Sequence, residues 1–129
     1  MHEQGSDLGT VKIANDVIAS IAGIAALEVE GVADLSSGGG LAGEVAEILG
    51  RRDWNRGVKV EVVNQGVFID MGVVVEYGVA IPEVTWQIQE NVKQAVENMT
   101  GLNVAEVNIK IQSVRPAQEI KNNRFYGEE

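Results

Sequence analysis

Residues 57–77 read GVKVEVVNQGVFIDMGVVVEY, and the alternation within them decides the fold. Apolar residues occupy every second position over 58–62 and again over 67–77, which is the period of a strand with one buried face. The NQG between the two runs, residues 64–66, is typical of a short hairpin loop. We therefore expect an antiparallel hairpin whose second strand turns one apolar row to the core, made of Val67, Ile69, Met71, Val73, Val75 and Tyr77.

A helix is predicted directly after the hairpin, over IPEVTWQIQENVKQAVENMTG at 81–101. Pro82 suits its first turn and Gly101 its C-terminal stop. Trp86 falls outside the apolar stripe, beside charged residues, so we expect it to be exposed. The stripe itself should lie on the core and consists of Val84, Ile88, Val92, Ala95, Val96 and Met99.

The remaining elements are predicted on either side of these two. TVKIA at 10–14 indicates a short strand, and Asn15 is an apt N-cap for a helix over about 16–28. This helix is apolar almost all round, so something must cover it on more than one side. LAGEVAEILG at 41–50 indicates a short helix after a glycine-rich stretch, and the alternation over 104–114 indicates a last strand.

The expected order is therefore β-α-(α)-β-β-α-β. Strands that are apolar on one face only predict an α+β fold, a two-layer α/β sandwich with a mostly antiparallel four-stranded sheet, helices on one face and a wet opposite face. We divide the chain into a flexible N-terminus (1–8), a single domain (9–115) and a polar C-terminal tail (116–129).

Composition argues against most kinds of catalysis. The 129 residues include no cysteine, and the one histidine, His2, stands beside the initiator methionine. Thiolate metal sites, cysteine nucleophiles and histidine proton shuttles are therefore unavailable to the body of the domain. We expect no enzyme activity, no cofactor and no metal. A net charge of -9 repels nucleic acid and anionic lipid. No signal peptide or membrane-spanning segment is visible.

Two binding motifs are weak. Gly38, Gly40 and Gly43 match the spacing of a dinucleotide-binding loop, but Glu44 and Glu47 would place negative charge where phosphate would sit, and a glycine hinge explains the stretch better. The strand order also invites comparison with RNA-binding sheets. Their base-stacking aromatics are missing from the wet face, which would carry a single aromatic, Phe68.

RRDWNRG at 51–57 concentrates arginine beside a tryptophan and has two open interpretations. The arginines can pair with neighbouring carboxylates while Trp54 packs as a core plug. Alternatively, the cluster is part of a contact surface, because arginine and tryptophan are enriched in interface hot spots. On the second interpretation, the protein-interaction residues are Arg51, Arg52, Trp54, Arg56 and Trp86, and the apolar first helix is a second candidate, for self-association.

Three stretches resemble a known family: GTVKIANDVIASIAGIAALEVEGV at 9–32, GGGLAGEVAEILGRRDWNRGVKVEV at 38–62, and VVVEYGVAIPEVTWQIQENVKQAVENMTGLNVAEVNIKIQSV at 73–114. Together they are similar to the alkaline shock protein family of Gram-positive-type bacteria, and most closely to its short YqhY-like branch. The run EYGVAIPEVTWQIQENV at 76–92 carries the resemblance most specifically.

The resemblance implies a cytoplasmic, non-enzymatic protein of cell-envelope stress and membrane-lipid homeostasis, with a link to fatty-acid synthesis through acetyl-CoA carboxylase. Implied partners are proteins: copies of itself, other family members or lipid-synthesis enzymes, with any membrane association made through a partner. Two alternatives stay open. One is a nucleic-acid-associated regulator that uses Arg51, Arg52 and Arg56, and the other is a small-molecule sensor that uses the loop from Gly38 to Gly43.

Overall fold

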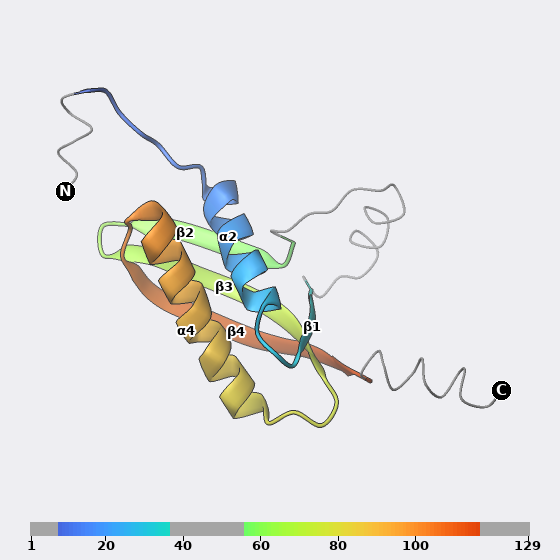
Figure 1. Cartoon of the computed structure of the whole chain (residues 1–129). Coiled ribbons are helices and arrows are strands. Elements are labelled where there is room, and N and C mark those ends of the chain that lie inside the picture. The colour runs from blue at the N-terminus through green and yellow to red at the C-terminus, as the bar shows by residue number, and fades with distance from the viewer. Residues whose placement is uncertain (1–7, 37–55, 117–129) are drawn as a thin grey trace, which may run out of the picture.

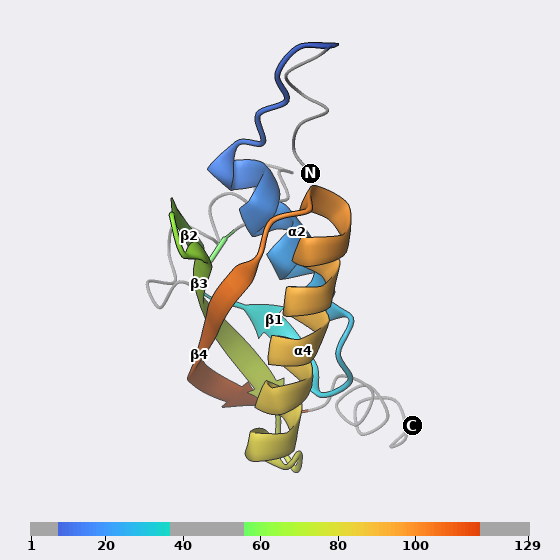
Figure 2. The ribbon, with the colours of Figure 1, turned by 90° about the vertical axis from the view of Figure 1, so that its left-hand side faces the viewer.

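The computed structural model describes residues 8–36 and 56–116. Over these ranges the chain forms two layers, with both helices packed on one face of a four-stranded sheet (Figure 1, Figure 2). The expected α+β sandwich with helices on one face is confirmed. In chain order the elements are α2 (Asn15–Leu27), β1 (Val32–Leu35), β2 (Val58–Val63), β3 (Gly66–Glu76), α4 (Ile81–Thr100) and β4 (Val104–Arg115).

The sheet is built around β3. β4 runs parallel to β3 along nearly its whole length, while β2 pairs antiparallel with the first half of β3 and β1 antiparallel with the second half. Because a strand has only two edges, β2 and β1 lie end to end along the edge that β4 leaves open. The sheet is mostly antiparallel, as expected. The parallel pair arises because α4 carries the chain back along the sheet before β4 begins.

Gly72 marks the point at which β3 changes partner from β2 to β1. Its N–H donates to the carbonyl of Gly57 at 3.0 Å, and its carbonyl accepts a hydrogen bond from the N–H of Ser36 at 2.9 Å. A Cβ atom added to Gly72 would overlap the carbonyl oxygen of Ser36. Only glycine therefore lets both partner segments reach β3 at the same residue.

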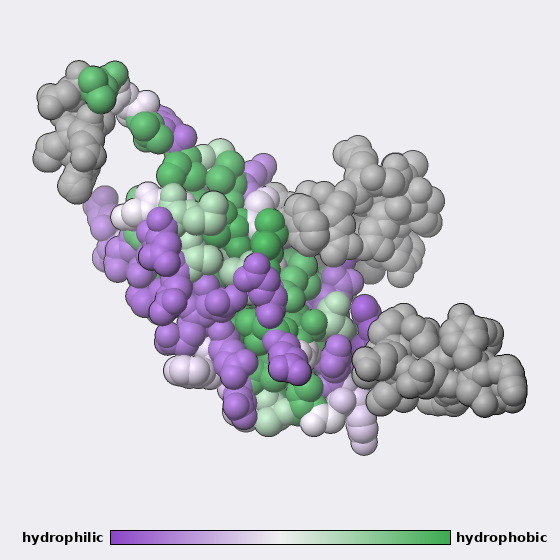
Figure 3. Space-filling view, viewed as in Figure 1, coloured by the Kyte–Doolittle hydropathy of each residue, from purple (hydrophilic) through white to green (hydrophobic). Residues whose placement is uncertain are grey.

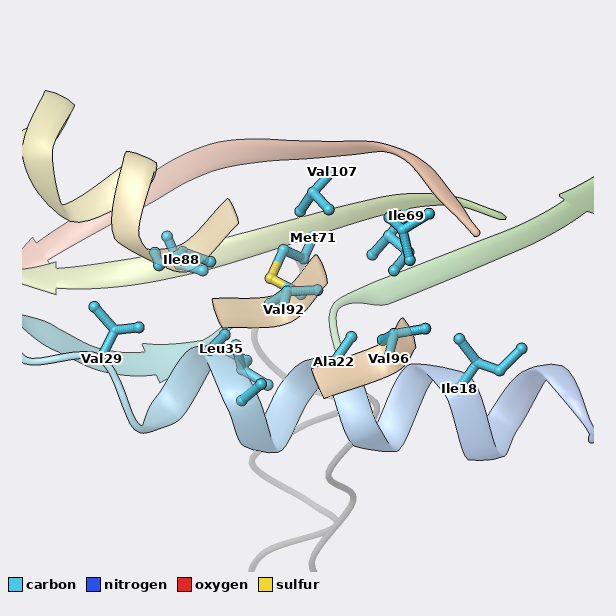
Figure 4. Close-up of a cluster of buried hydrophobic side chains, with 14 of the residues drawn as sticks. Ile18, Ala22, Val29, Leu35, Ile69, Met71, Ile88, Val92, Val96 and Val107 are labelled. Atoms are coloured by element: carbon cyan, nitrogen blue, oxygen red, sulfur yellow. The ribbon is translucent and has the colours of Figure 1, made fainter. Parts of the chain in front are cut away.

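The core lies between the helices and the inner face of the sheet (Figure 4). β3 supplies the expected apolar row, and α4 buries the centre of its predicted stripe. α2 contacts α4, β2 and β1, which confirms that it is covered on more than one side. Its alanines allow this close approach. The fully buried large side chains are Ile18, Ile69, Ile88, Val67, Val73, Val75, Val92 and Val96.

The strand predicted at 10–14 is wrong. These residues form no strand, and Val11 is 83% exposed. The missing strand is β1, at Val32–Leu35, which the sequence analysis did not predict. β4 along one edge of β3 and β2 and β1 along the other leave no open edge on the central strand, and the 10–14 segment pairs with no strand. The order over the described residues is thus α-β-β-β-α-β. The short helix predicted at 41–50 lies outside the described residues.

The predictions for the residues that begin and end the helices are confirmed in part. Pro82 lies in the first turn of α4 and Gly101 ends it with a positive φ of 78°, both as predicted. Asn15 is not an N-cap: that position belongs to Ala14, and the Asn15 amide reaches across to the carbonyl of Val60 at 3.4 Å.

Three side chains also differ in exposure from what the apolar patterns predict. Tyr77 is 80% exposed because β3 ends one residue before it, and Met99 is 69% exposed in the last turn of α4. The face of the sheet opposite the helices is not wet throughout either. Val74 alternates with the inward-facing residues of β3, yet it is only 4% exposed.

Candidate protein-interaction surface

The structure describes two of the five residues predicted to bind partners. Arg51, Arg52 and Trp54 lie outside the described residues, so their role stays a prediction. Arg56 precedes β2 at the edge of the sheet, and Trp86 lies in the first half of α4. They lie in different parts of the fold.

Arg56 is bound into the fold through β1. Its Nη2 donates to the carboxylate oxygens of Asp34 at 3.3 and 3.4 Å and to the carbonyl of Leu35 at 3.0 Å. Arg115, at the end of β4, brings its Nη2 within 3.8 Å of the same carboxylate. The nearby carboxylates that sequence predicts as its partners lie outside the described residues, and Asp34 comes from a strand that sequence did not predict. Arg56 therefore links β1 to the segment that leads into β2, which supports a structural role.

Trp86 is exposed, as predicted from its place on the helix. Its residue is 60% exposed although it carries the largest apolar side chain of α4. It stands at the rim of a groove of about 340 Å³ between α4 and the end of α2. α4 lines the groove with Trp86, Gln87, Glu90, Asn91 and Gln94, and the chain after α2 lines it with Glu28, Val29 and Glu30.

A hydrogen bond between the helices holds the two walls of this groove together. The amide of Asn91 donates to the carbonyl of Ala25 at 2.8 Å, in the last turn of α2, where carbonyls lack their regular intrahelical partner. The N–H of Glu28 is bonded to the carbonyls of Ile24 and Ala25. Both walls are therefore fixed by backbone geometry before anything binds.

Sequence analysis missed the acidic wall of this groove. Glu28 caps the C-terminal end of α2, and the last turn of this helix carries no basic residue. A carboxylate at the negative end of a helix is repelled by the macrodipole, so Glu28 lowers the stability of α2. This unfavourable position could have marked Glu28 in the sequence, but only the tertiary structure brings it beside Trp86.

The first helix offers less apolar surface than its composition predicts. Most of its apolar side chains are used inside the domain, and the larger ones left in solvent are Val17 at 49% and Ile24 at 41% exposure. The space-filling view shows hydrophobic surface along α2, beside a largely hydrophilic α4 (Figure 3). A role for α2 in self-association stays a prediction that rests on this stripe.

A second hollow, of about 480 Å³, lies on the outer face of the sheet around Gly72. Lys59 and Lys110 approach it from β2 and β4, and the amide of Asn108 donates to the carboxylate of Asp70 at 2.9 Å beside it. Its volume is within the range of about 300–1,000 Å³ that is usual for small-molecule pockets. Its charges are mixed, so this hollow has no evident preference for anions or for cations.

Ionisable groups elsewhere in the described residues serve the fold. The pKa of Glu97 is lowered because its carboxylate accepts a hydrogen bond from the backbone N–H of Val104 at 2.9 Å and another from the ammonium of Lys93 at 3.1 Å. Over 8–36 and 56–116, no group of acidic, histidine or cysteine side chains is arranged to hold a metal ion. Neither helix of these ranges is long and apolar enough to cross a membrane.

Comparison with known proteins identifies the family. The model of the alkaline shock protein 23 family, described as having a cell envelope-related function, matches residues 3–116. This chain belongs to that family. The resemblance found in the sequence is thereby confirmed, and so is a relation to the cell envelope.

Relatives in the family are similar over most of their length. Protein YqhY of Bacillus subtilis is 43% identical, over 94% of this chain and 90% of its own, and YloU of the same organism is 38% identical, over 83% and 89%. A stress response regulator gls24 homolog of Streptococcus pyogenes is 29% identical, and the match covers 63% of that longer protein. Among solved structures, the nickel form of a MamM CTD variant aligns with a TM-score of 0.46 and 15% identity, over 76% of this chain and 96% of that one, which is too distant to support any argument.

Proposed function

We propose that this family member is a non-enzymatic regulatory protein that acts by binding other proteins, in the response to envelope stress and in membrane-lipid homeostasis. Acetyl-CoA carboxylase is the candidate target, through which the protein would modulate fatty-acid synthesis. It would work in the cytoplasm, with any association with the membrane made through a partner.

One observation carries the proposal: the exposure of Trp86 at the rim of a preformed groove. Leaving an indole 60% exposed forgoes burial of the largest apolar side chain on α4. Exposed tryptophan is rare in the absence of a partner and frequent at the centre of interfaces, where it contributes large contact area at little conformational cost. The described carboxylates support binding rather than chemistry, because they lie at the surface or in structural contacts such as those of Asp34 and Glu97.

Co-purification with acetyl-CoA carboxylase tests the proposal directly. Tagged protein would be isolated from its native host at moderate and at high salt, and the carboxylase subunits quantified in the eluate. Fatty-acid synthesis would be followed in parallel as acetate incorporation in cells with and without the protein. We expect recovery of the carboxylase that persists in part at high salt, and a changed rate of incorporation.

The matched pair Trp86→Ala and Met99→Ala locates the contact. Both residues are exposed on α4, at 60% and 69%, but only Trp86 lines the groove. Trp86→Ala should lose the carboxylase and Met99→Ala should keep it. Recovery of nucleic acid that disappears at high salt, with no carboxylase, would instead support the alternative based on the arginine cluster.

The outer-face hollow favours small-molecule sensing as a second candidate function. Its lining by Lys59, Lys110 and Asp70 suits a polar ligand that carries both positive and negative groups. Nucleotides and acyl-CoA compounds would be screened for thermal stabilisation, which grows with ligand concentration for any compound that binds only the folded state. No shift at millimolar ligand would remove this candidate.

A further inference from the structure

We propose that the groove beside Trp86 binds a short basic segment of a partner protein, with an arginine or lysine of that segment stacked on the indole. The proposal rests on the proposed function, because it names the chemistry of the partner at the same site. It does not depend on which protein supplies the segment. For brevity we call the groove lined by Glu28, Glu30, Trp86 and Glu90 the acidic groove.

Charge is the first reason. Glu28, Glu30 and Glu90 face one small volume, and within the described residues none of them forms an ion pair. Several cations of the described residues lie elsewhere: Arg56 and Arg115 at Asp34, Lys93 at Glu97, and Lys59 and Lys110 at the outer-face hollow. The groove thus holds three negative charges that the described part of the chain does not neutralise, and a cationic ligand would relieve their mutual repulsion.

The indole decides what kind of cation fits. A guanidinium or ammonium group placed over the face of tryptophan is attracted by the electrons of the ring, and tryptophan is the best aromatic residue for this contact. Trp86 is exposed enough to offer a ring face, and carboxylates stand beside it to pair with the same cation. A metal ion is not favoured, because no acidic group of the described residues is arranged to hold one, and it would leave the exposure of Trp86 unexplained.

The size and rigidity of the acidic groove suit a peptide side chain. About 340 Å³ is at the small end of ligand pockets, enough for a side chain but cramped for a whole cofactor. Because Asn91 ties α4 to the end of α2, little has to be ordered on binding. The amides of Gln87 and Gln94, also in the lining, can bond the peptide backbone on either side of the cation.

Net charge argues for another protein rather than a second copy of this chain. Each copy carries -9, so two copies repel at long range, whereas a basic segment is drawn in and its association is accelerated. Binding of such a segment should therefore be fast, of modest affinity and sensitive to salt, while contacts around Trp86 keep part of the affinity at high salt.

Labelled peptides test the proposal without any host partner. We would measure fluorescence anisotropy of a peptide with the sequence GRRGRRG, a citrulline version without the charges, and GEEGEEG, against the full chain at about 50 and 300 mM salt. Only the arginine peptide should bind. Trp86→Ala should weaken it roughly two- to fivefold, as expected for an exposed cation–π contact, and the triple variant Glu28→Gln, Glu30→Gln, Glu90→Gln about tenfold or more.

A matched triple variant distinguishes binding in the acidic groove from attraction by the net charge of the chain. Glu61→Gln, Glu76→Gln and Glu106→Gln remove the same three charges from strands of the sheet, and Glu61 and Glu106 pair with Phe68 on the outer face. This control should bind the arginine peptide nearly as well as the original chain. A loss equal to that of the groove variant would overturn the proposal, because attraction by overall charge would then explain everything.

A site-specific signal completes the test. In a Trp54→Phe background Trp86 is the only tryptophan, and the arginine peptide should protect it from iodide quenching. Anisotropy that rises while quenching stays unchanged would place the peptide elsewhere and refute the proposal. If peptides fail to bind while the carboxylase is still recovered, the basic-segment inference is wrong and the proposed function stands. If peptides bind but the carboxylase is not recovered, the basic-segment inference stands and the carboxylase is not the partner.

Discussion

Replacing Gly72 with alanine should destabilise the sheet at the residue where β3 changes partner from β2 to β1. A Cβ on this residue would come closer than 3.0 Å to the backbone of Ser36 and to the side chain of Gln112. Gln112 can swing away, but Ser36 is fixed because its N–H donates to the carbonyl of Gly72. The conflict must therefore be relieved by moving β1 away from β3.

The cost follows from two contributions. Overpacking that forces a backbone shift costs about 1–3 kcal/mol. Loss or weakening of the bond from Ser36 to Gly72 adds about 0.5–1.5 kcal/mol. We expect a total of about 1.5–4.5 kcal/mol, a large share of the 5–15 kcal/mol that is typical of a whole domain. At about 4–8 °C per kcal/mol for a domain of this size, the Tm should fall by roughly 6–36 °C.

Urea unfolding followed by circular dichroism would measure this loss, and a second variant would identify its cause. Gln112→Ala by itself should be within about 0.5 kcal/mol of the original chain. The double variant Gly72→Ala, Gln112→Ala should be as unstable as Gly72→Ala, since Ser36 is still in place. Full recovery in the double variant, or a loss below about 0.5 kcal/mol in Gly72→Ala, would refute the close approach of β1 that this reasoning assumes.

Three further predictions concern the core, the response to acid and the exposed indole. Ile88→Ala empties a fully buried site and should cost about 2–5 kcal/mol in urea unfolding, whereas the half-exposed Val114→Ala should change little. The pKa of Glu97 lies below its ordinary value of about 4.5, so its stabilising effect is complete above pH 4.5 and is lost as the pH falls through the lowered pKa. Glu97→Gln should then be less stable than the original chain at pH 7 and lose less stability between pH 5 and 2, and parallel acid titrations of both would contradict this. With Trp54 replaced by Phe, iodide should quench Trp86 readily in the isolated protein, and a shielded indole would contradict the exposure on which the groove argument depends.

Local patterns predicted the second half of the chain well. The β2–β3 hairpin and α4 follow from alternation, from a helical stripe and from Pro82 and Gly101, all of which act between near neighbours in sequence. The strand predicted at 10–14 failed for the opposite reason. Its alternation is as good as that of β1, but pairing depends on which edge of β3 is open, and this is a property of the whole sheet.

The candidate site was likewise predictable only where it depends on local sequence. The helical wheel placed Trp86 in solvent because exposure on one helix is a local property. The acidic groove could not be predicted, since Glu28 and Glu90 belong to different helices and only their packing brings them together. The ion pair of Arg56 could not be predicted for a similar reason: its partner Asp34 lies in the strand that sequence missed.

The arrangement of β1 and β2 along one edge of β3 also sets an order of events in folding. The hairpin needs only the turn at Asn64 and Gln65, whereas β1 must find β3 across a long stretch of chain, and its loop-closure entropy is lost before its few bonds form. β1 should therefore dock late and detach first, with amide exchange near Leu35 faster than in the hairpin. When it detaches, it uncovers the unpaired backbone of β3 from Val73 to Val75, so local opening at this end, without global unfolding, can offer the edge of the central strand to another molecule.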